Sequence, residues 1–281
     1  MKKFLFFCLF CSLSLSSFAF SVGDFFFKNS RFWQNRFSLD ILSGNDVLAG
    51  MEFDLIGHRD IENKIYAFRV PLMVKFDMVD FTFEPFFYPN TNNDASAYGG
   101  KLTVKGVIRD NQITNNSSQG YLKAAYAVQN ANVERLGLVN KEDFKQFVFE
   151  GGLNFNFGGL YNFDIGGNIF NYPDKVNEVG AFGGIMNQAE VGNLGTIDYV
   201  LALPRFSAGG GITWLSTENS AKSSLSYRYI GYEKDLTAHS VMVKTTIPID
   251  TNVLITLIYN HLFETHRTNR DLFGAGINYL F

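Results

Sequence analysis

Large apolar side chains alternate with polar residues or glycine along most of the chain. In the clearest example, residues 147–157, Phe149 and Leu153 share one parity and Glu150 and Asn154 share the other. A period of two is the signature of a β-strand, whose successive side chains point to opposite faces. The alternating segments are about 9 to 13 residues long, the length that a tilted strand needs to cross a bilayer. The pattern predicts an all-β chain of antiparallel strands.

Neighbouring segments match each other as hairpins. A three-residue turn at 158–160 sets Phe155 beside Phe163 and Leu153 beside Ile165, and polar residues then meet polar residues on the other face. One register satisfies both faces, which is the condition that fixes strand pairing.

A second hairpin is predicted about a two-residue turn at 77–78. It sets Leu72 beside Phe83 on the apolar face and Lys75 beside Asp80 on the polar face. Opposite charges that face each other across two strands favour this register.

A third hairpin is predicted about a turn at 249–251, which sets Thr245 beside Ile255. The same register sets His239 opposite His261 on the apolar face, near the strand ends. Two facing histidines could share a divalent metal, but they belong to no compact ligand motif. The simpler interpretation is that the two histidines place their polar ring atoms at the edge of an apolar surface. We expect no metal site and no cofactor.

Residues 1–19 have the features of an export signal. Two lysines come first, residues 4–15 are an apolar run, and Ser17 and Ala19 form a small-x-small cleavage site. We therefore predict a signal peptide over 1–19 and a single barrel domain over 20–281.

The two cysteines, Cys8 and Cys11, both lie inside this signal. Each follows a phenylalanine, where the processing site of a lipoprotein needs a small residue, so we do not expect a lipoprotein. The mature chain then has no disulfide and no thiolate metal ligand. The net charge is −3 and no basic block is present, so nucleic acid is not an expected partner.

Alternation alone does not tell whether the apolar face meets a protein core or lipid. Aromatic residues make up 16% of the chain, including 30 Phe, and a soluble core of this size would struggle to hide them. After residue 15, no segment offers the roughly 18 consecutive apolar residues of a transmembrane helix. A closed barrel is the other structure that satisfies its backbone in lipid. The sequence therefore predicts a transmembrane antiparallel β-barrel.

Connections of alternating length support this prediction, because barrels of this kind have short periplasmic turns and longer outer loops. The longer polar connections are expected at 88–96, 130–143, 171–177 and 264–271.

Counting back from a periplasmic C-terminus gives about fourteen strands. They are predicted at 46–57, 64–76, 79–88, 97–108, 119–129, 145–157, 161–171, 178–187, 195–203, 205–215, 222–232, 238–248, 252–263 and 272–281. About sixteen strands result if 36–43 pairs with part of 24–33, and about twelve if 178–203 is one long loop. The segment 20–43 is therefore left open as strand, plug or lead-in.

The last eight residues, 274–281, resemble the C-terminal signal by which the barrel-assembly machinery recognises bacterial outer-membrane proteins. Gly276, Tyr279 and Phe281 occupy matching positions, although Gly274 stands where a polar residue is usual. The resemblance implies insertion by that machinery and a location in the bacterial cell outer membrane. Outer-membrane fatty-acid transporters look similar in strand number, but their Asn-Pro-Ala hatch motif is absent from the sequence. Monomeric porins and outer-membrane phospholipases are similar in size, and no subfamily is identified.

The parity that turns the rings toward lipid turns a set of charged residues inward. These candidate lumen-lining residues are Glu52, Asp54, Arg69, Lys75, Asp80, Glu84, Lys101, Lys105, Lys123, Glu150, Asp164, Arg205, Arg228 and Lys244. They either form a constriction that selects solutes or pair with one another inside a narrow barrel. Barrels above about twelve strands usually enclose water, whereas smaller ones are filled by side chains.

A set of aromatic residues near the predicted strand ends suggests girdles at the membrane interfaces. These residues are Tyr88, Tyr172, Trp214, Tyr232, Tyr279 and Phe281. The sequence contains no nucleophile and base at a spacing that would indicate a catalytic pair, so we do not expect an enzyme.

The leading hypothesis is a passive porin-like channel for small solutes, with outer-membrane lipid as its surroundings. The alternative is a structural or adhesive protein with a closed lumen and interacting loops, chiefly 130–144 and 264–271.

Overall fold

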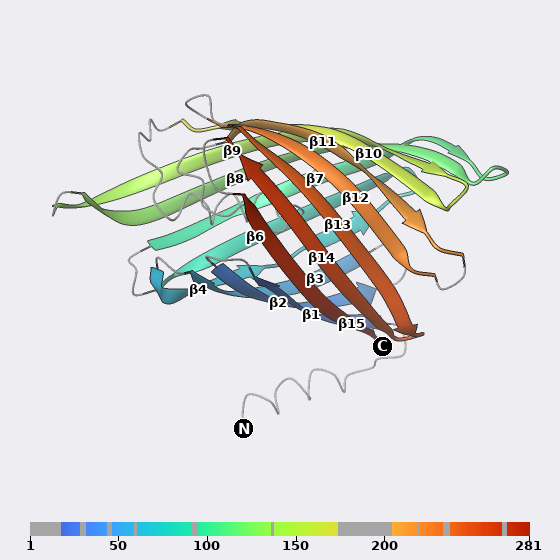
Figure 1. Ribbon diagram of the computed structural model, residues 1–281, viewed down its shortest axis with the longest axis horizontal. Helices are drawn as coiled ribbons and strands as arrows, with labels where there is room; N and C mark the ends of the chain where they lie inside the picture. Colours follow the sequence, from blue (N-terminus) through green and yellow to red (C-terminus); the bar gives the residue numbers. More distant parts are fainter. Residues whose placement is uncertain are drawn as a thin grey trace, which may run out of the picture.

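In the computed structural model, antiparallel strands form one continuous sheet that closes on itself as a barrel (Figure 1). The structure describes residues 18–28, 32–43, 47–58, 61–91, 95–135, 138–173, 204–217, 220–232, 237–265 and 269–281. Within these residues, no helix is both long and apolar enough to cross a membrane.

Consecutive strands pair with each other except β4 and β5, and β1 also pairs with β15 to close the barrel. The strands are β1 Phe18–Lys28, β2 Phe32–Ser43, β3 Val47–His58, β4 Ile61–Arg69, β5 Leu72–Lys75, β6 Val79–Thr91, β7 Ala95–Asn111, β8 Asn116–Arg135, β9 Leu138–Phe157, β10 Tyr161–Asn171, β11 Pro204–Leu215, β12 Lys222–Tyr232, β13 Thr237–Asp250, β14 Val253–Glu264 and β15 Arg270–Leu280.

The segments β4 and β5 form one interrupted strand of the barrel wall. Both pair with β3 on one side and β6 on the other, and the break falls at Val70 and Pro71. Pro71 cannot donate a ladder hydrogen bond, and its carbonyl instead accepts one from Gly50 at 2.8 Å. Counting the two segments as one gives a barrel of fourteen strands.

The two ends of the barrel differ. The end with the C-terminus carries tight turns such as 158–160 and 251–252, and we call it the turn end. The opposite end carries the connection between β10 and β11, and we call it the loop end. At the loop end, β8 and β9 extend far beyond the rest of the barrel as a hairpin (Figure 1).

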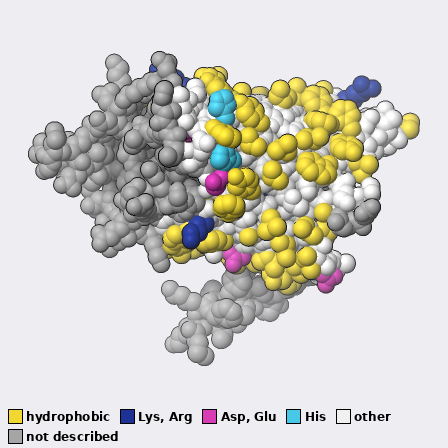
Figure 2. All heavy atoms as spheres, viewed as in Figure 1, with side chains coloured by type: hydrophobic (Ala, Val, Ile, Leu, Met, Phe, Trp, Pro, Cys, Tyr) yellow, Lys and Arg dark blue, Asp and Glu magenta, His cyan; other side chains and the backbone are white. Residues whose placement is uncertain are grey.

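Side chains alternate between an exterior face and an interior face throughout the barrel. Along β10, Phe163, Ile165 and Ile169 are exposed, whereas Asn168 and Phe170 on the other parity are buried. On the face that Figure 2 shows, the exposed apolar side chains cover a broad area of the outside of the barrel. A band of this kind is the surface that a barrel presents to hydrocarbon. The large rings therefore face outward, as the alternation predicts.

The predicted hairpin registers are confirmed in two cases out of three. Phe155 pairs with Phe163 about the turn at 158–160, and Lys75 pairs with Asp80 about the turn at 77–78.

The third register is wrong by two residues. Thr245 pairs with Leu257, because the turn is the two-residue step 251–252 and the ladder is irregular between Pro248 and Asp250. Proline lacks the amide hydrogen of a regular ladder, which explains why the irregularity falls there. A shift of two preserves the parity of the strand, so both faces of the hairpin are as predicted.

The fourteen strands also differ from the fourteen that the sequence predicts. The segments 18–28 and 32–43 form β1 and β2, so this part of the chain is barrel wall and neither plug nor lead-in. The strands predicted at 178–187 and 195–203 lie outside the described residues, and β10 pairs directly with β11.

One further boundary needs correction, and one lies mostly outside the described residues. The loop predicted at 130–143 is wrong, because β8 and β9 continue their pairing as far as Arg135 and Leu138. The signal predicted at 1–19 falls mostly outside the described residues, and β1 begins at Phe18. Cleavage after residue 19 therefore stays a prediction.

Candidate functional site

The candidate site is the interior face of the barrel, where most of the predicted charged residues lie. Arg205 is the exception, because it is exposed at the irregularity that opens β11 and does not follow the regular parity of that strand. The others group by strand into three clusters with different partners.

The first cluster is a buried network on β2, β3, β4 and β6. Asp54 accepts from Arg36 Nε at 2.8 Å and lies 2.8 Å from Arg69 Nη1. Arg69 also donates to Glu52 at 3.2 Å and to the Tyr88 hydroxyl at 3.2 Å. The side chains of Arg69 and Asp54 are only 3% and 1% exposed. The two arginines and two carboxylates pair with one another largely away from water, so this network is part of the barrel wall.

The second cluster consists of ion pairs between neighbouring strands. Lys101 Nζ lies 2.8 Å from Glu84, and Lys123 Nζ lies 2.8 Å from Glu150. The Tyr121 hydroxyl also donates to Glu150 at 3.1 Å. These four charges therefore compensate one another in the wall of the lumen.

Glycines of the interior face make room for the large side chains of this cluster. A Cβ on Gly152 would lie 2.6 Å from the Tyr121 ring, and a Cβ on Gly166 would lie 2.5 Å from its hydroxyl. Tyr121 thus lies flat across β9 and β10. Arg228 donates to Ser207 at 3.1 Å in the neighbouring part of the wall.

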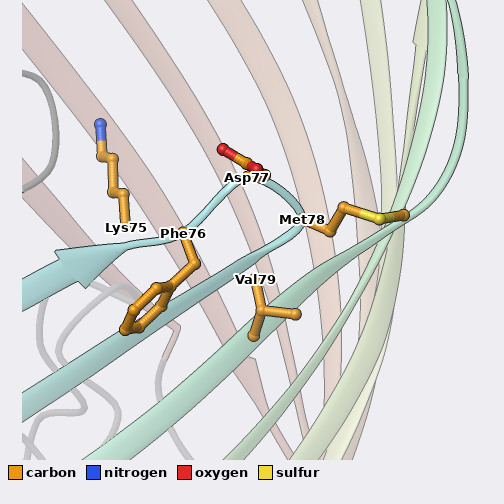
Figure 3. A pocket seen from close by; sticks show the side chains of 5 residues that line it. All are labelled: Lys75, Phe76, Asp77, Met78 and Val79. Atoms are coloured by element: carbon orange, nitrogen blue, oxygen red, sulfur yellow. The ribbon is translucent and has the colours of Figure 1, made fainter.

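The third cluster stands at the turn end and is exposed to solvent. On one wall, Asp80 lies between Lys75 and Lys105 in the register, but none of the three makes an ion pair within the described residues. Figure 3 shows Lys75 and Asp77 extending from one side of the turn and Phe76 and Val79 from the other. A hollow of about 440 Å³ lies beside these turn residues.

On the facing wall, Lys222 and Lys244 lie on the interior face of β12 and β13. The register pairs Lys222 with Thr246 and Ser224 with Lys244, so the two lysines are diagonal neighbours. Both side chains are exposed, and neither makes an ion pair in the part of the chain that the structure describes. Lys244 follows the predicted interior parity, whereas Lys222 is missing from the prediction because it is the first residue of its strand.

Toward the loop end, the interior face carries a ring of buried apolar side chains, which we call the collar. The collar residues are Phe27, Ile56, Ala67, Phe86, Ala125, Val148, Phe170, Ile230, Ala238, Leu262 and Leu272. Several pack together as one cluster that also includes Tyr232. Interior residues are therefore covered at this level and open to solvent at the turn end.

The predicted aromatic girdle is right for one group and wrong for another. Trp214, Tyr279 and Phe281 are exposed on or beyond the strands, as a girdle requires. Tyr88 and Tyr232 are only 3% and 5% exposed and lie on the interior face. Whether an aromatic residue near a strand end faces outward depends on its parity along the strand.

Tyr172 also belongs to the interior, because its hydroxyl donates to the Pro204 carbonyl at 2.9 Å. The girdle prediction is wrong for this residue as well.

The histidines of the exterior face are not opposite each other. His239 pairs with Phe263, and its Nδ1 lies 2.7 Å from the Tyr227 hydroxyl. His261 Nδ1 lies 2.6 Å from Asp271, which is its partner across β14 and β15. Figure 2 shows histidine side chains beside an acidic one at one edge of the apolar band.

The contacts of His239 and His261 do not indicate a catalytic site. Within the described residues, no serine, threonine or cysteine bonds to His261, and no group of three or more metal-ligating side chains occurs.

The three residues of the C-terminal resemblance lie on different faces. Tyr279 and Phe281 are exposed, whereas Gly276 lies on the interior face of β15. A Cβ on Gly276 would overlap the ring of Phe25 on β1. Packing alone therefore requires glycine at this position.

Three solved structures share this architecture. The NanC porin matches with a TM-score of 0.50 at 8% identity, over 92% of this chain and 98% of that one. The CymD monoaromatic hydrocarbon channel matches with a TM-score of 0.51 at 8% identity, over 94% and 88%. CdiB from Acinetobacter baumannii matches with a TM-score of 0.53 at 10% identity, over 95% of this chain and 60% of that one.

This is the fold of a bacterial outer-membrane β-barrel. The closed sheet and its exposed apolar band place the chain in the outer membrane, with lipid as its surroundings. No protein-family model matches the sequence, and no curated protein matches it. The subfamily is therefore not identified.

Proposed function

We propose that the protein is a porin-like channel through which small solutes diffuse across the outer membrane. The observation that carries the proposal is a closed barrel of fourteen strands whose interior charges at the turn end are exposed to solvent. Eight-stranded barrels are filled by side chains, whereas barrels of about sixteen strands leave an aqueous channel. The printed names of the NanC porin and the CymD monoaromatic hydrocarbon channel support the class of channel, and neither name is carried over as the solute of this chain.

In this proposal the turn end faces the periplasm, because short turns of outer-membrane barrels lie on that side. The chain is exported by the signal at 1–19 and inserted by the barrel-assembly machinery, with small solutes as its transient partners. The charged residues of the second and third clusters, including Lys75, Lys101, Lys105 and Lys123, line the path.

The collar favours a second candidate function. Buried apolar residues around the interior face are what a barrel with a closed lumen would have. A closed barrel would serve as a structural or adhesive protein, with the β8–β9 hairpin as its most prominent surface.

Single-channel recording in planar bilayers separates the two functions. The barrel is refolded in detergent, and folding is verified by its heat-modifiable mobility in electrophoresis. A channel gives stepwise current increments in potassium chloride, and the same preparation boiled before addition gives none. Folded barrels that insert without current steps would contradict the channel and support the closed lumen.

A further inference from the structure

The cationic side chains of the interior face are of two kinds: some form an ion pair with a carboxylate, and others do not. Arg69, Lys101 and Lys123 each contact a carboxylate of a neighbouring strand at 3.2 Å or less. Lys75, Lys105, Lys222 and Lys244 form no ion pair within the described residues, but Lys75 and Lys105 both face Asp80 in the register, whereas Lys222 and Lys244 face hydroxyl residues. The compensated cations stabilise the wall, whereas the uncompensated ones leave positive charge directed at the lumen.

Lys222 and Lys244 lie close enough to repel each other. As diagonal neighbours on one face of paired strands, their Cβ atoms are separated by about 7 Å. Like charges at this separation repel. Asp164, an exposed interior carboxylate, lies on β10, and β11 separates β10 from β12. Two strand spacings, roughly 10 Å, lie between Asp164 and the nearer lysine strand.

Hydroxyl groups surround the lysine pair. Ser224 lies directly opposite Lys244 in the register, and Thr246 lies opposite Lys222. The Thr246 and Thr256 hydroxyls are 3.0 Å apart on the adjacent wall. Ammonium groups flanked by hydroxyl donors can bind the oxygens of a carboxylate or a phosphate. An anion between the ammonium groups would relieve their repulsion.

Among the described carboxylates near the same end of the barrel, none forms an ion pair with Lys222 or Lys244. Asp250 accepts from the backbone nitrogen of Thr251 at 2.6 Å and from its hydroxyl at 3.2 Å. Asp77 lies on the turn beside Lys75, and β5 is on the opposite side of the closed sheet from β12.

We propose that Lys222 and Lys244 form an anion-binding step at the turn end of the lumen, which makes the path selective for small solutes bearing carboxylate or phosphate groups. This inference rests on the proposed channel and names its solute class. Selectivity should weaken as salt rises, because the screening length falls from about 30 Å at 0.01 M to about 3 Å at 1 M.

The test compares the wild type with the double variant Lys222→Gln/Lys244→Gln. Lys28→Gln is the control, because Lys28 is an exposed lysine on the exterior parity of β1. The reversal potential in a potassium chloride gradient reports selectivity. The wild type and the control should prefer chloride, and the double variant should lose that preference. Asp164→Asn should increase it.

Binding of inorganic phosphate to the detergent-folded barrel, measured by calorimetry, gives a second readout that needs no current. We expect about tenfold weaker binding in the double variant than in the control. Current without chloride preference, or a double variant equal to the control, would overturn the anion step and leave the channel standing. If the barrel carried no current but still bound phosphate through the two lysines, the proposed channel would be overturned and the anion site would stand.

Discussion

Gly276 is the residue at which a packing requirement and an assembly signal overlap. Phe25 of β1 covers Gly276 at the seam where the first and last strands close the barrel. The C-terminal resemblance assigns the same glycine to recognition by the assembly machinery. The sequence alone does not separate these roles, because it leaves the segment that forms β1 open as strand, plug or lead-in.

Replacing Gly276 with alanine should destabilise the barrel by about 1 to 3 kcal/mol, since the added methyl group overlaps the Phe25 ring. Phe25→Ala in the same chain should restore folding by making room for it. The measurement is urea unfolding of the purified barrel in detergent, where no assembly machinery is present. Gly120→Ala is the control, because the nearest atom to its Cβ would be the flexible end of the Ile108 side chain at 3.3 Å.

The double variant also tests the assembly signal inside cells. If packing is the whole requirement, Gly276→Ala/Phe25→Ala should reach the outer membrane at the wild-type level. A double variant that folds in detergent and yet fails to insert in cells would show that the machinery reads the glycine itself.

The buried charge network of β2, β3, β4 and β6 could be predicted only in part from the sequence. Parity correctly identified Asp54 and Arg69 as interior, but it missed Arg36 and Tyr88, which complete their network. Arg36 lies in a segment that was left open as a lead-in, and Tyr88 was assigned to the girdle. A contact between strands distant in sequence depends on barrel closure, which local alternation does not encode.

At the scale of elements, the long hairpin formed by β8 and β9 has an unusual position in the sheet. Pairing between β7 and β8 ends at Ala131, and pairing between β9 and β10 ends at Phe147. Beyond these points, within the residues that the structure describes, the two strands pair with each other alone. Among those residues, the extension adds no ladder to the closed wall.

Deleting residues 133–140 and joining Asn132 to Lys141 by an Asn-Gly turn should leave the barrel intact. Asn-Gly matches the two-residue turn that these paired strands need. We expect the free energy of unfolding to change by less than about 1 kcal/mol. Urea unfolding and single-channel current measure the outcome. Loss of current from a folded, shortened chain would instead assign the hairpin a role in the open path.

Registers could be predicted wherever both faces carried a clear pattern. The hairpin at 158–160 is right because an apolar face and a polar face agree on one pairing. The hairpin near Pro248 is wrong because a two-residue shift preserves parity, so the hydrophobic pattern cannot detect it. Only the backbone irregularity, caused by the missing proline amide, sets the true register.

At the scale of the whole molecule, the account depends on which face of the closed sheet meets hydrocarbon. The exterior face exposes large rings that a soluble protein would bury, such as Phe149 and Phe273 at 57% and 61%. The interior face carries the charge networks and the uncompensated lysines. The strand total of fourteen was predicted correctly, but from a different set of segments, because barrel size does not follow from any one hairpin.

The most direct test labels β10 with single cysteines, which is possible because residues 20–281 contain no cysteine. Spin labels are placed at Asn162, Phe163, Asp164 and Ile165 in barrels refolded into lipid vesicles. The account predicts that labels at Phe163 and Ile165 collide mainly with oxygen dissolved in the bilayer, and labels at Asn162 and Asp164 with a water-soluble nickel chelate. Equal accessibility at all four positions, or the opposite alternation, would contradict it.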